Sequence, residues 1–460
     1  MLSITHSHIK FLITLFLLVQ SPSVYSVNWL MLQGTEPAKV THRPFIFMQP
    51  SYTQDLSDEI SLGPNAGKAA VPTTIAPWFE DDSKFHFRRA RAGVRGNFTG
   101  MAKNKFTEKM NYFVLTELAP NLLTYDFLGD RERQIAPDHF SITFNHIEGA
   151  RLRFGLFKTP GLEETYQGIV AQDYIEFTDF AARESLERFA TGNSRASPSG
   201  GINGSIGTPV TESQGFNGAR DWGVQVFDSF KRDEWDYTYA VMLGRGTGIH
   251  ESSRAQDPLE QYYYLSAEKD LPGGKGPWKH GVKYYVWLQN GVRVFESDPI
   301  QQEYDRQRYG IGARGQGKLF GLDNRQRLDV EFMVADGMVF VGPAGAVKGG
   351  DLMFAAEDGN KSQALSIDYG YFVTPKWETM IRWDKHELLN QTDGVVWTDG
   401  DARDIKTMTY GVQYHFSRKM KLAFNYIDRT VTAPNESHAV VQDVVGSIKN
   451  RYSFQLTWIY

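Results

Sequence analysis

Three observations predict that this sequence forms an all-β protein, a transmembrane antiparallel β-barrel of about sixteen strands. The chain ends on a strand of strictly alternating side chains. Its alternating segments are joined by links of two different lengths, and its first residues have the layout of an export signal. Outer-membrane barrels combine these features, with short turns on the periplasmic side and long loops outside.

The last eleven residues, Asn450 to Tyr460, form the clearest strand. A period of two places on one face the side chains of Tyr452, Phe454, Leu456, Trp458 and Tyr460, all apolar or aromatic. The other face is mostly polar. A transmembrane barrel turns the apolar face to lipid and the polar face to its wet lumen. The aromatic end of the chain also looks like the C-terminal signal of bacterial outer-membrane proteins, so we expect the barrel-assembly machinery as a partner.

The first residues have the layout of a secretory signal peptide. Lys10 precedes an apolar run from Phe11 to Val19, and a cleavage site follows Ser26. The run is shorter than the ~20 residues of a membrane-spanning helix, which disfavours the alternative of an uncleaved anchor. We therefore expect a signal peptide over residues 1–26, a periplasmic N-terminal segment over 27–42 and the barrel over 43–460.

The composition excludes several other classes of protein. The chain has no cysteine, so it has neither a disulfide nor a thiolate metal site, and we expect no cofactor. Charge is spread evenly and not in basic blocks, which argues against nucleic acid as a partner. Without residues 1–26 the chain carries 48 basic and 54 acidic residues, a net charge of −6, so the overall charge predicts no anionic partner.

Sixteen segments alternate in the same way, and each is close to the ~10 residues with which a tilted strand crosses the hydrocarbon layer. In order they lie at residues 43–55, 84–99, 106–118, 138–147, 150–158, 220–230, 233–244, 260–269, 280–290, 306–315, 325–335, 363–372, 376–386, 406–416, 420–430 and 450–460.

The links between these segments run alternately long and short. The clearest short links are 148–149, 231–232, 373–375 and 417–419. Long links include 56–83, 119–137, 159–219, 336–362 and 431–449. This asymmetry predicts short periplasmic turns, long extracellular loops and both ends of the barrel in the periplasm. A soluble sandwich has no reason to show it.

The link over residues 159–219 is the longest, at sixty-one residues. Such length usually signals a function or disorder. Because this link leaves the fifth strand, we expect it to fold inward and narrow the pore. The alternative is a surface loop that packs on a neighbouring subunit or is simply mobile.

Arginines in three of the predicted strands fall on the face that is expected to line the lumen. Where alternate residues are apolar, the arginines between them point to the water-filled side. The candidate pore-lining and anion-binding residues are Arg89, Arg91, Arg95, Arg151, Arg153, Arg306, Arg308 and Arg314. A guanidinium can hold a phosphate or carboxylate with two hydrogen bonds, so a column of them favours anions. The alternative is a balanced wall, in which these arginines pair with inward acids, namely Glu117, Asp329, Glu331, Asp368 and Asp384.

Two stretches carry a family resemblance. The first, Phe87-Arg88-Arg89-Ala90-Arg91-Ala92-Gly93-Val94-Arg95-Gly96, is similar to an arginine-rich early strand of the phosphate-selective porin O and P family. The second, Arg151-Leu152-Arg153-Phe154-Gly155-Leu156-Phe157-Lys158-Thr159-Pro160 followed by Leu162-Glu163-Glu164, resembles the "GxFK-P" strand end before that family's long loop. The resemblance implies a sixteen-stranded, usually trimeric channel for small anions.

Together these observations predict an outer-membrane porin, a passive diffusion channel for small hydrophilic solutes with a modest preference for anions such as phosphate. The expected partners are outer-membrane lipid and lipopolysaccharide, small anionic solutes and further copies of the chain in a homotrimer. The alternatives are a sugar-conducting barrel and a structural barrel closed by its long loop.

Two enzyme-like motifs and an acidic loop carry less weight. Residues 310–315 spell G-x-G-x-x-G without the strand-to-helix crossover of a dinucleotide fold. Ser205 has Asn203 where a G-x-S-x-G elbow needs glycine, so an outer-membrane hydrolase is disfavoured and we expect no enzyme. The loop 392–404 gathers aspartates that could bridge lipopolysaccharide through a divalent ion. A solvated loop is the simpler interpretation, and we expect no resident metal.

Overall fold

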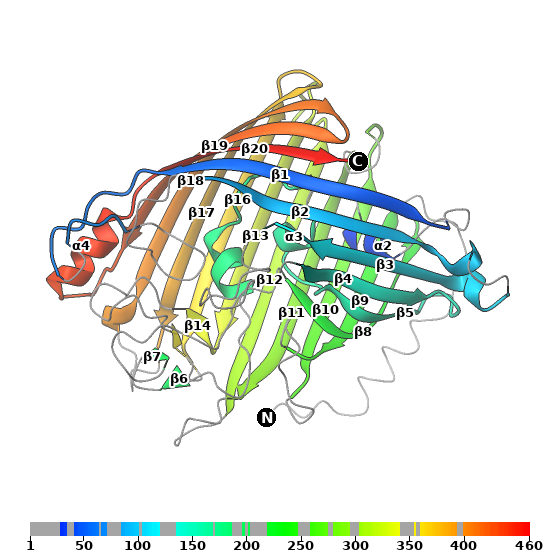
Figure 1. Cartoon of the computed structure of the whole chain (residues 1–460), viewed down its shortest axis with the longest axis horizontal. Helices are drawn as coiled ribbons and strands as arrows, with labels where there is room; N and C mark the ends of the chain where they lie inside the picture. Colours follow the sequence, from blue (N-terminus) through cyan, green and yellow to red (C-terminus); the bar gives the residue numbers. More distant parts are fainter. Residues whose placement is uncertain are drawn as a thin grey trace.

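Sixteen antiparallel strands close into one barrel in the computed structural model (Figure 1). The structure describes residues 28–34, 41–63, 66–70, 84–100, 104–119, 135–168, 171–185, 196–197, 201–202, 219–246, 258–274, 279–294, 303–340, 354–355, 359–392 and 399–460. Each barrel strand is hydrogen-bonded to its neighbours in chain order, and the last strand returns to the first. The fold class predicted from the alternating segments and their links is confirmed.

The barrel strands match the sixteen alternating segments in order. They are β1 (Arg43–Asp55), β2 (Lys84–Asn97), β3 (Met110–Glu117), β4 (Ala136–Phe144), β5 (Arg151–Lys158), β8 (Arg220–Arg232), β9 (Trp235–Gly244), β10 (Glu260–Asp270), β11 (Gly281–Val294), β12 (Glu303–Gly317), β13 (Gln326–Asp336), β16 (Lys361–Phe372), β17 (Trp377–Gln391), β18 (Arg403–Ser417), β19 (Met420–Thr432) and β20 (Arg451–Ile459). No strand end differs from its predicted position by more than five residues, and the largest difference is at the end of β17.

Shorter elements lie before β1 and in the links. Two pairs of very short strands form ribbons, β6 (Ala196–Ser197) with β7 (Gly201–Ile202) and β14 (Val339–Phe340) with β15 (Phe354–Ala355). The helices and helical turns are α2 (Trp29–Gly34), η1 (Phe98–Gly100), η2 (Thr107–Lys109), α3 (Glu163–Tyr166), η4 (Ala181–Ser185), η6 (Asp399–Asp401) and α4 (Ala439–Ser447). No helix in the described ranges is long and apolar enough to cross a bilayer.

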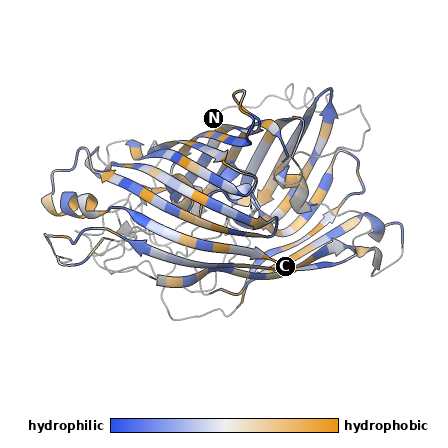
Figure 2. Ribbon diagram, turned by 90° about the horizontal axis from the view of Figure 1, so that it is seen from above, coloured by the Kyte–Doolittle hydropathy of each residue, from blue (hydrophilic) through white to orange (hydrophobic). Residues whose placement is uncertain are grey.

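Side chains alternate between the two faces of the wall, and Figure 2 shows this as hydrophobic and hydrophilic bands along the strands. On the outer face, Leu265 and Ile311 are 57% and 59% exposed. On the inner face, Gln413 and Asn425 are each 1% exposed. A water-soluble domain keeps most of its large apolar side chains inside. The reversed distribution here suits a wall with lipid outside and a polar interior.

The pairing of β1 with β20 closes the barrel. Tyr52 lies opposite Phe454 in the register of these strands. The terminal Tyr460 extends the pairing, since its N–H donates to the carbonyl of Ile46 at 2.9 Å and its carbonyl accepts from the N–H of Ile46 at 3.3 Å. Because the closed sheet has no free edge, the strands satisfy one another's backbone groups without water.

The two ends of the barrel differ. At one end the turns between β8 and β9 and between β18 and β19 have two residues each. At the other end the links are long, and α4 packs there, where Val444 and Val445 share an apolar cluster with Ile405 and Val431 of β18 and β19. Short turns and long loops therefore segregate to opposite ends, as the link lengths predicted.

Several expectations concern parts of the chain that the structure does not describe. The signal peptide expected over residues 1–26 lies outside the described residues, and so does the stretch 393–398 of the acidic loop 392–404. The domain boundaries stay predictions. Within the described ranges, no three His, Asp or Glu side chains are placed to hold a metal ion together.

Deleting Tyr460 is expected to reduce assembly of the barrel severalfold, because the closing pair of strands loses two backbone hydrogen bonds and its aromatic end. Heat-modifiable migration of the membrane fraction measures the assembled share. Tyr460→Phe keeps both hydrogen bonds and the ring, and serves as the control. A deletion variant that assembles as fully as this control would contradict the role given to the terminal residue.

Candidate functional site

Residues 159–168 and 171–185, called the inner loop below, turn into the barrel. The N–H of Thr159 donates to the carbonyl of Ala219 at 2.9 Å and closes the base of the long link. From there the chain crosses the lumen, since Glu163 contacts Lys283 of β11 and Glu176 contacts Arg451 of β20. Figure 1 shows α3 inside the wall. Residues 186–195, 198–200 and 203–218 lie outside the described residues, so the full extent of the loop over 159–219 stays a prediction.

Lys158, the last residue of β5, holds the start of the inner loop. Its buried ammonium donates to the carbonyls of Thr165 at 2.9 Å and Tyr166 at 3.4 Å, and also to the carbonyl of Gln167. These carbonyls lie at the end of α3, where the helix itself offers them no partner. Lys158 is also the lysine of the "GxFK-P" strand end. The motif therefore has a physical role, which is to direct the chain back across the lumen.

Every acid in the described inner loop faces a cation or a histidine on the wall. The pairs are Glu163–Lys283 (2.7 Å), Glu164–Arg382 (2.9 Å), Asp173–Arg314 (3.0 Å), Glu176–Arg451 (3.2 Å), Asp179–His386 (2.8 Å) and Glu184–Arg308 (3.2 Å). Their wall residues come from β11, β12, β17 and β20. Ion pairs and charged hydrogen bonds therefore tie the loop to one side of the barrel.

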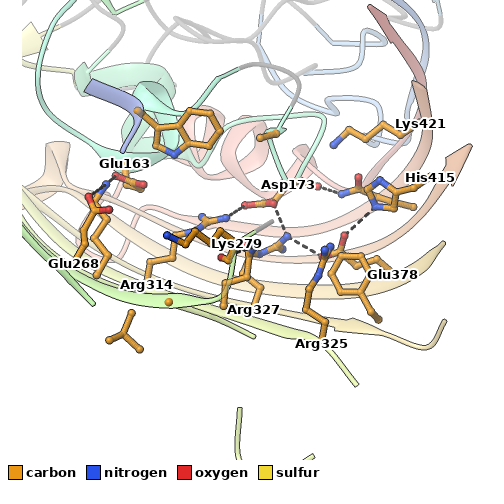
Figure 3. A pocket seen from close by; sticks show the side chains of 18 residues that line it. Glu163, Asp173, Glu268, Lys279, Arg314, Arg325, Arg327, Glu378, His415 and Lys421 are labelled. Carbon is orange, nitrogen blue, oxygen red and sulfur yellow. Dashed lines mark hydrogen bonds and ion pairs between the residues drawn. The ribbon is translucent and has the colours of Figure 1, made fainter. Parts of the chain in front are cut away.

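A luminal pocket of about 60 Å³ lies between the inner loop and the wall of β10 to β19 (Figure 3). Asp173 projects from the loop between Arg314 and Arg327. Six cationic residues line the pocket: Lys279, Lys283, Arg314, Arg325, Arg327 and Lys421. Four acids line it: Glu163, Asp173, Glu268 and Glu378. The lining is therefore positive, although the whole chain has a net charge of −5.

Two of these cations, Arg325 and Lys421, form no ion pair with any described residue. The guanidinium carbon of Arg325 lies 3.4 Å from the centroid of the Phe372 ring. The ammonium of Lys421 donates to the carbonyl of Gln172. A ring or a carbonyl carries no net charge. Arg325 and Lys421 therefore carry the uncompensated positive charge of the luminal pocket.

A second pocket, called the rim pocket, extends from Arg325 to the end of the barrel with the short turns. Its volume is about 520 Å³. Its lining contains three cations and no Asp or Glu, and includes Arg325, Lys376, Arg418, His415, Phe372 and Phe416. Arg325, Phe372 and His415 line both pockets. Positive residues thus follow one path from the lumen to the rim.

The predicted arginines of β2 and β5 are each held by partners in or beside the wall. These partners are Gln49 for Arg89 (2.8 Å), Glu117 and Asp138 for Arg91 (2.7 and 3.0 Å), the ring of Phe113 for Arg95 (5.1 Å), Asp228 for Arg151 (3.2 Å) and the ring of Phe227 for Arg153 (4.3 Å). The sequence left open the alternative of a balanced wall, in which the arginines pair with inward acids. This alternative applies to Arg91, which pairs with Glu117.

The predicted arginines of β12 reach the inner loop. Arg306 and Arg308 are fully buried and donate to the carbonyl of Glu184 at 3.0 and 3.1 Å. Arg314 lies between Asp173 and Asp329 and lines the luminal pocket. The structure thus brings one of the eight predicted arginines to this pocket. Anion binding by any of the eight stays a prediction.

Most of the cations that line the luminal pocket are not among the residues predicted from the sequence. A signal for three of them was present. Arg327 has the parity of the inward Asp329 on β13, and Lys421 alternates with the outward Leu422 on β19. Arg325 opens the predicted strand 325–335 and shares the parity of Arg327 and Asp329, although β13 itself begins at Gln326.

No protein-family model and no curated protein matches the sequence. Among solved structures, the chain is similar to Salmonella typhi OmpF in a complex with daunomycin, with a TM-score of 0.53, 10% identity, and 92% of this chain and 98% of that chain covered. It is also similar to the outer membrane channel DcaP of Acinetobacter baumannii, with a TM-score of 0.52, 10% identity, and 93% of this chain and 99% of that chain covered. The likeness shows that this chain shares the β-barrel fold of these proteins. The narrower resemblance to the phosphate-selective family stays a prediction.

Replacing Lys158 with methionine is expected to loosen the inner loop, because three carbonyls lose a charged donor, and hydrogen bonds to charged groups contribute about 1.5–3 kcal/mol each. Limited trypsin digestion of the folded barrel measures the effect at Arg183, which is buried in the loop. We expect cleavage after Arg183 in Lys158→Met and protection in the unsubstituted chain. Lys449→Met, at a half-exposed lysine outside the loop, is the control. Equal protection in both variants would contradict the anchoring role of Lys158.

Protonation of Glu176 at low pH is expected to weaken the attachment of the inner loop to β20. Burial raises the pKa of its carboxyl, but Arg451 and Arg88 outweigh burial and lower the pKa to about 2. The carboxylate therefore stabilises the attached loop fully above its ordinary pKa of 4.5, and this contribution is lost as the pH falls toward about 2. Pepsin digestion near the buried Phe180, measured relative to the unfolded chain, should accelerate over this range. Glu176→Gln should weaken the dependence of the digestion rate on pH. An unchanged pH profile in this variant would contradict the role of Glu176 in holding the loop.

Proposed function

We propose that the protein is an outer-membrane diffusion channel for small hydrophilic solutes with a modest preference for anions. The observation that carries the proposal is the path from the luminal pocket to the rim pocket, on which Arg325 and Lys421 have no ion pair with a described residue. The barrel fold, which the chain shares with OmpF and DcaP, supports a channel in the outer membrane.

Anion preference follows from where the charges lie and not from their sum. A solute in a narrow passage meets fixed charges at short range, where bulk water screens them less completely. Charges on the outer loops lie farther away, and physiological saline largely screens charges beyond ~8 Å. The positive lining of the two pockets therefore outweighs the negative balance of the chain.

Phosphate and carboxylate are the anions that this lining suits. A guanidinium offers paired N–H donors that match two oxygens of either group. Arg325 borders both pockets and is held by a ring instead of a carboxylate, so its charge is available to a passing anion. The resemblance to the phosphate-selective porin O and P family favours phosphate among these anions.

The rest of the proposal concerns the setting of the channel. The chain is exported through a signal peptide over residues 1–26, inserted by the barrel-assembly machinery and surrounded by outer-membrane lipid and lipopolysaccharide. It assembles as a homotrimer, as the family resemblance implies. Cross-linking of the protein in its native membrane and determination of its first residue test these two points.

A sugar pore is less well supported. Such a pore presents exposed aromatic rings to the solute. Inside this barrel the rings of Tyr166, Tyr264, Tyr285 and Trp287 are at most 3% exposed and pack between the inner loop and the wall. They form an apolar core within the lumen and offer little surface to a sugar.

Replacing both Arg325 and Lys421 with glutamate is expected to shift selectivity toward cations, because two uncompensated positive charges become negative. The reversal potential of single channels in a salt gradient measures the shift, and high salt should reduce it. The matched control is Lys318→Glu with Lys449→Glu, which makes the same change of charge at two lysines outside both pockets.

Each outcome separates the candidate functions. A cation-selective unsubstituted channel, or a selectivity that the double substitution leaves unmoved, would overturn the anion preference. An assembled barrel without current steps would favour the structural barrel closed by its loop. Block of the current by oligosaccharides would favour the sugar pore.

A further inference from the structure

The segment that precedes β1 lies inside the barrel. Asn28 and α2 sit next to β5 and β9, and Figure 1 shows the helix within the wall, behind β2 and β3. Asn28, Leu30 and Met31 are at most 3% exposed. The sequence predicts no more than a periplasmic segment over residues 27–42. Residues 28–34 of this segment pack inside the barrel.

Polar contacts fix this short helix to the wall. The side-chain oxygen of Asn28 accepts from the N–H of Met31 at 3.1 Å and caps the helix. The side-chain nitrogen of Asn28 donates to Thr238 of β9. The carbonyl of Leu30 accepts from the buried guanidinium of Arg153 on β5 at 3.4 Å. Two separate strands thus hold α2 in one position.

The other side of α2 packs on the inner loop. A methyl group at Gly168 would lie 2.9 Å from the ring of Trp29, so no side chain fits between them. Trp29 and Leu30 share an apolar cluster with Tyr166 of the loop and Tyr264 of β10. The helix therefore fills the space between the loop and the wall of β5 to β10.

We propose that residues 28–34 form a second constriction element, which closes the β5 side of the lumen and confines solutes to the luminal pocket. The inference rests on the proposed channel function and adds a determinant of solute size to it. The ion pairs of the inner loop reach β11, β12, β17 and β20, whereas α2 is held by β5 and β9. Trp29 lines the luminal pocket itself, so its indole bounds the passage that remains.

Deletion of residues 28–34 is expected to raise single-channel conductance about twofold, because ion flow follows the open cross-section of the pore. The same deletion should admit larger poly(ethylene glycol) molecules. Trp29→Ala should produce a smaller rise in the same direction. Trp377→Ala removes an indole from the outer face of β17 and should leave conductance unchanged.

A thiol experiment tests the position of Trp29 without deleting any backbone. The chain has no cysteine, so Trp29→Cys introduces a single thiol. A methanethiosulfonate that carries a trimethylammonium group should lower the current through Trp29→Cys channels and leave Trp377→Cys channels unaffected. This measurement decides the matter even if the deletion variant fails to assemble.

The outcomes separate this inference from the proposed function. Unchanged conductance in Trp29→Ala together with no response of Trp29→Cys would overturn the constriction role and leave the channel intact. A silent unsubstituted barrel whose deletion variant conducts would overturn the open channel and support the closing role of α2. Silence of all assembled variants would overturn both.

Discussion

At the end of β5 the ammonium of Lys158 is buried, and carbonyls at the end of α3 stabilise it in place of water. A charge in such a position is tolerated only while its hydrogen-bond partners stay in place. The first turn of the inner loop is therefore fixed to the wall. The direction of that turn brings Glu163 and Asp173 to the cations of β11 and β12, so the later contacts across the lumen depend on it.

The ion pairs inside the barrel hold loop and wall together as one unit. Arg327 contacts Asp173 of the loop and also Asp368 and Glu378 of neighbouring strands. Removing one member of such a buried group leaves the others uncompensated, which costs more than the pair contributes. Most charges in the lumen are thus structural. Arg325, which lies on the ring of Phe372 and lines the luminal pocket, remains outside these groups.

The strands could be predicted because their signal is local, whereas the contents of the lumen could not. Alternation identified all sixteen strands, and it failed at the end of β17, where Leu389 has a φ of 57° and breaks the period of two. Parity also suggested which arginines face inward. Their partners follow from contacts with no sequence period, as when Arg306 meets the carbonyl of Glu184, 122 positions away. The six-residue helix α2 has too few residues to show an amphipathic pattern.

Both described ends of the chain contact the barrel wall, and this limits where a label can be attached. A tag fused directly before Asn28 would have to share the interior with α2, and a tag after Tyr460 would extend the strand pair that closes the barrel. The exposed turn at Pro434 and Asn435, between β19 and α4, has neither constraint. Exposed loop tips of this kind tolerate insertions best. A fluorophore or affinity peptide placed there would follow the protein without disturbing the passage or the closing strands.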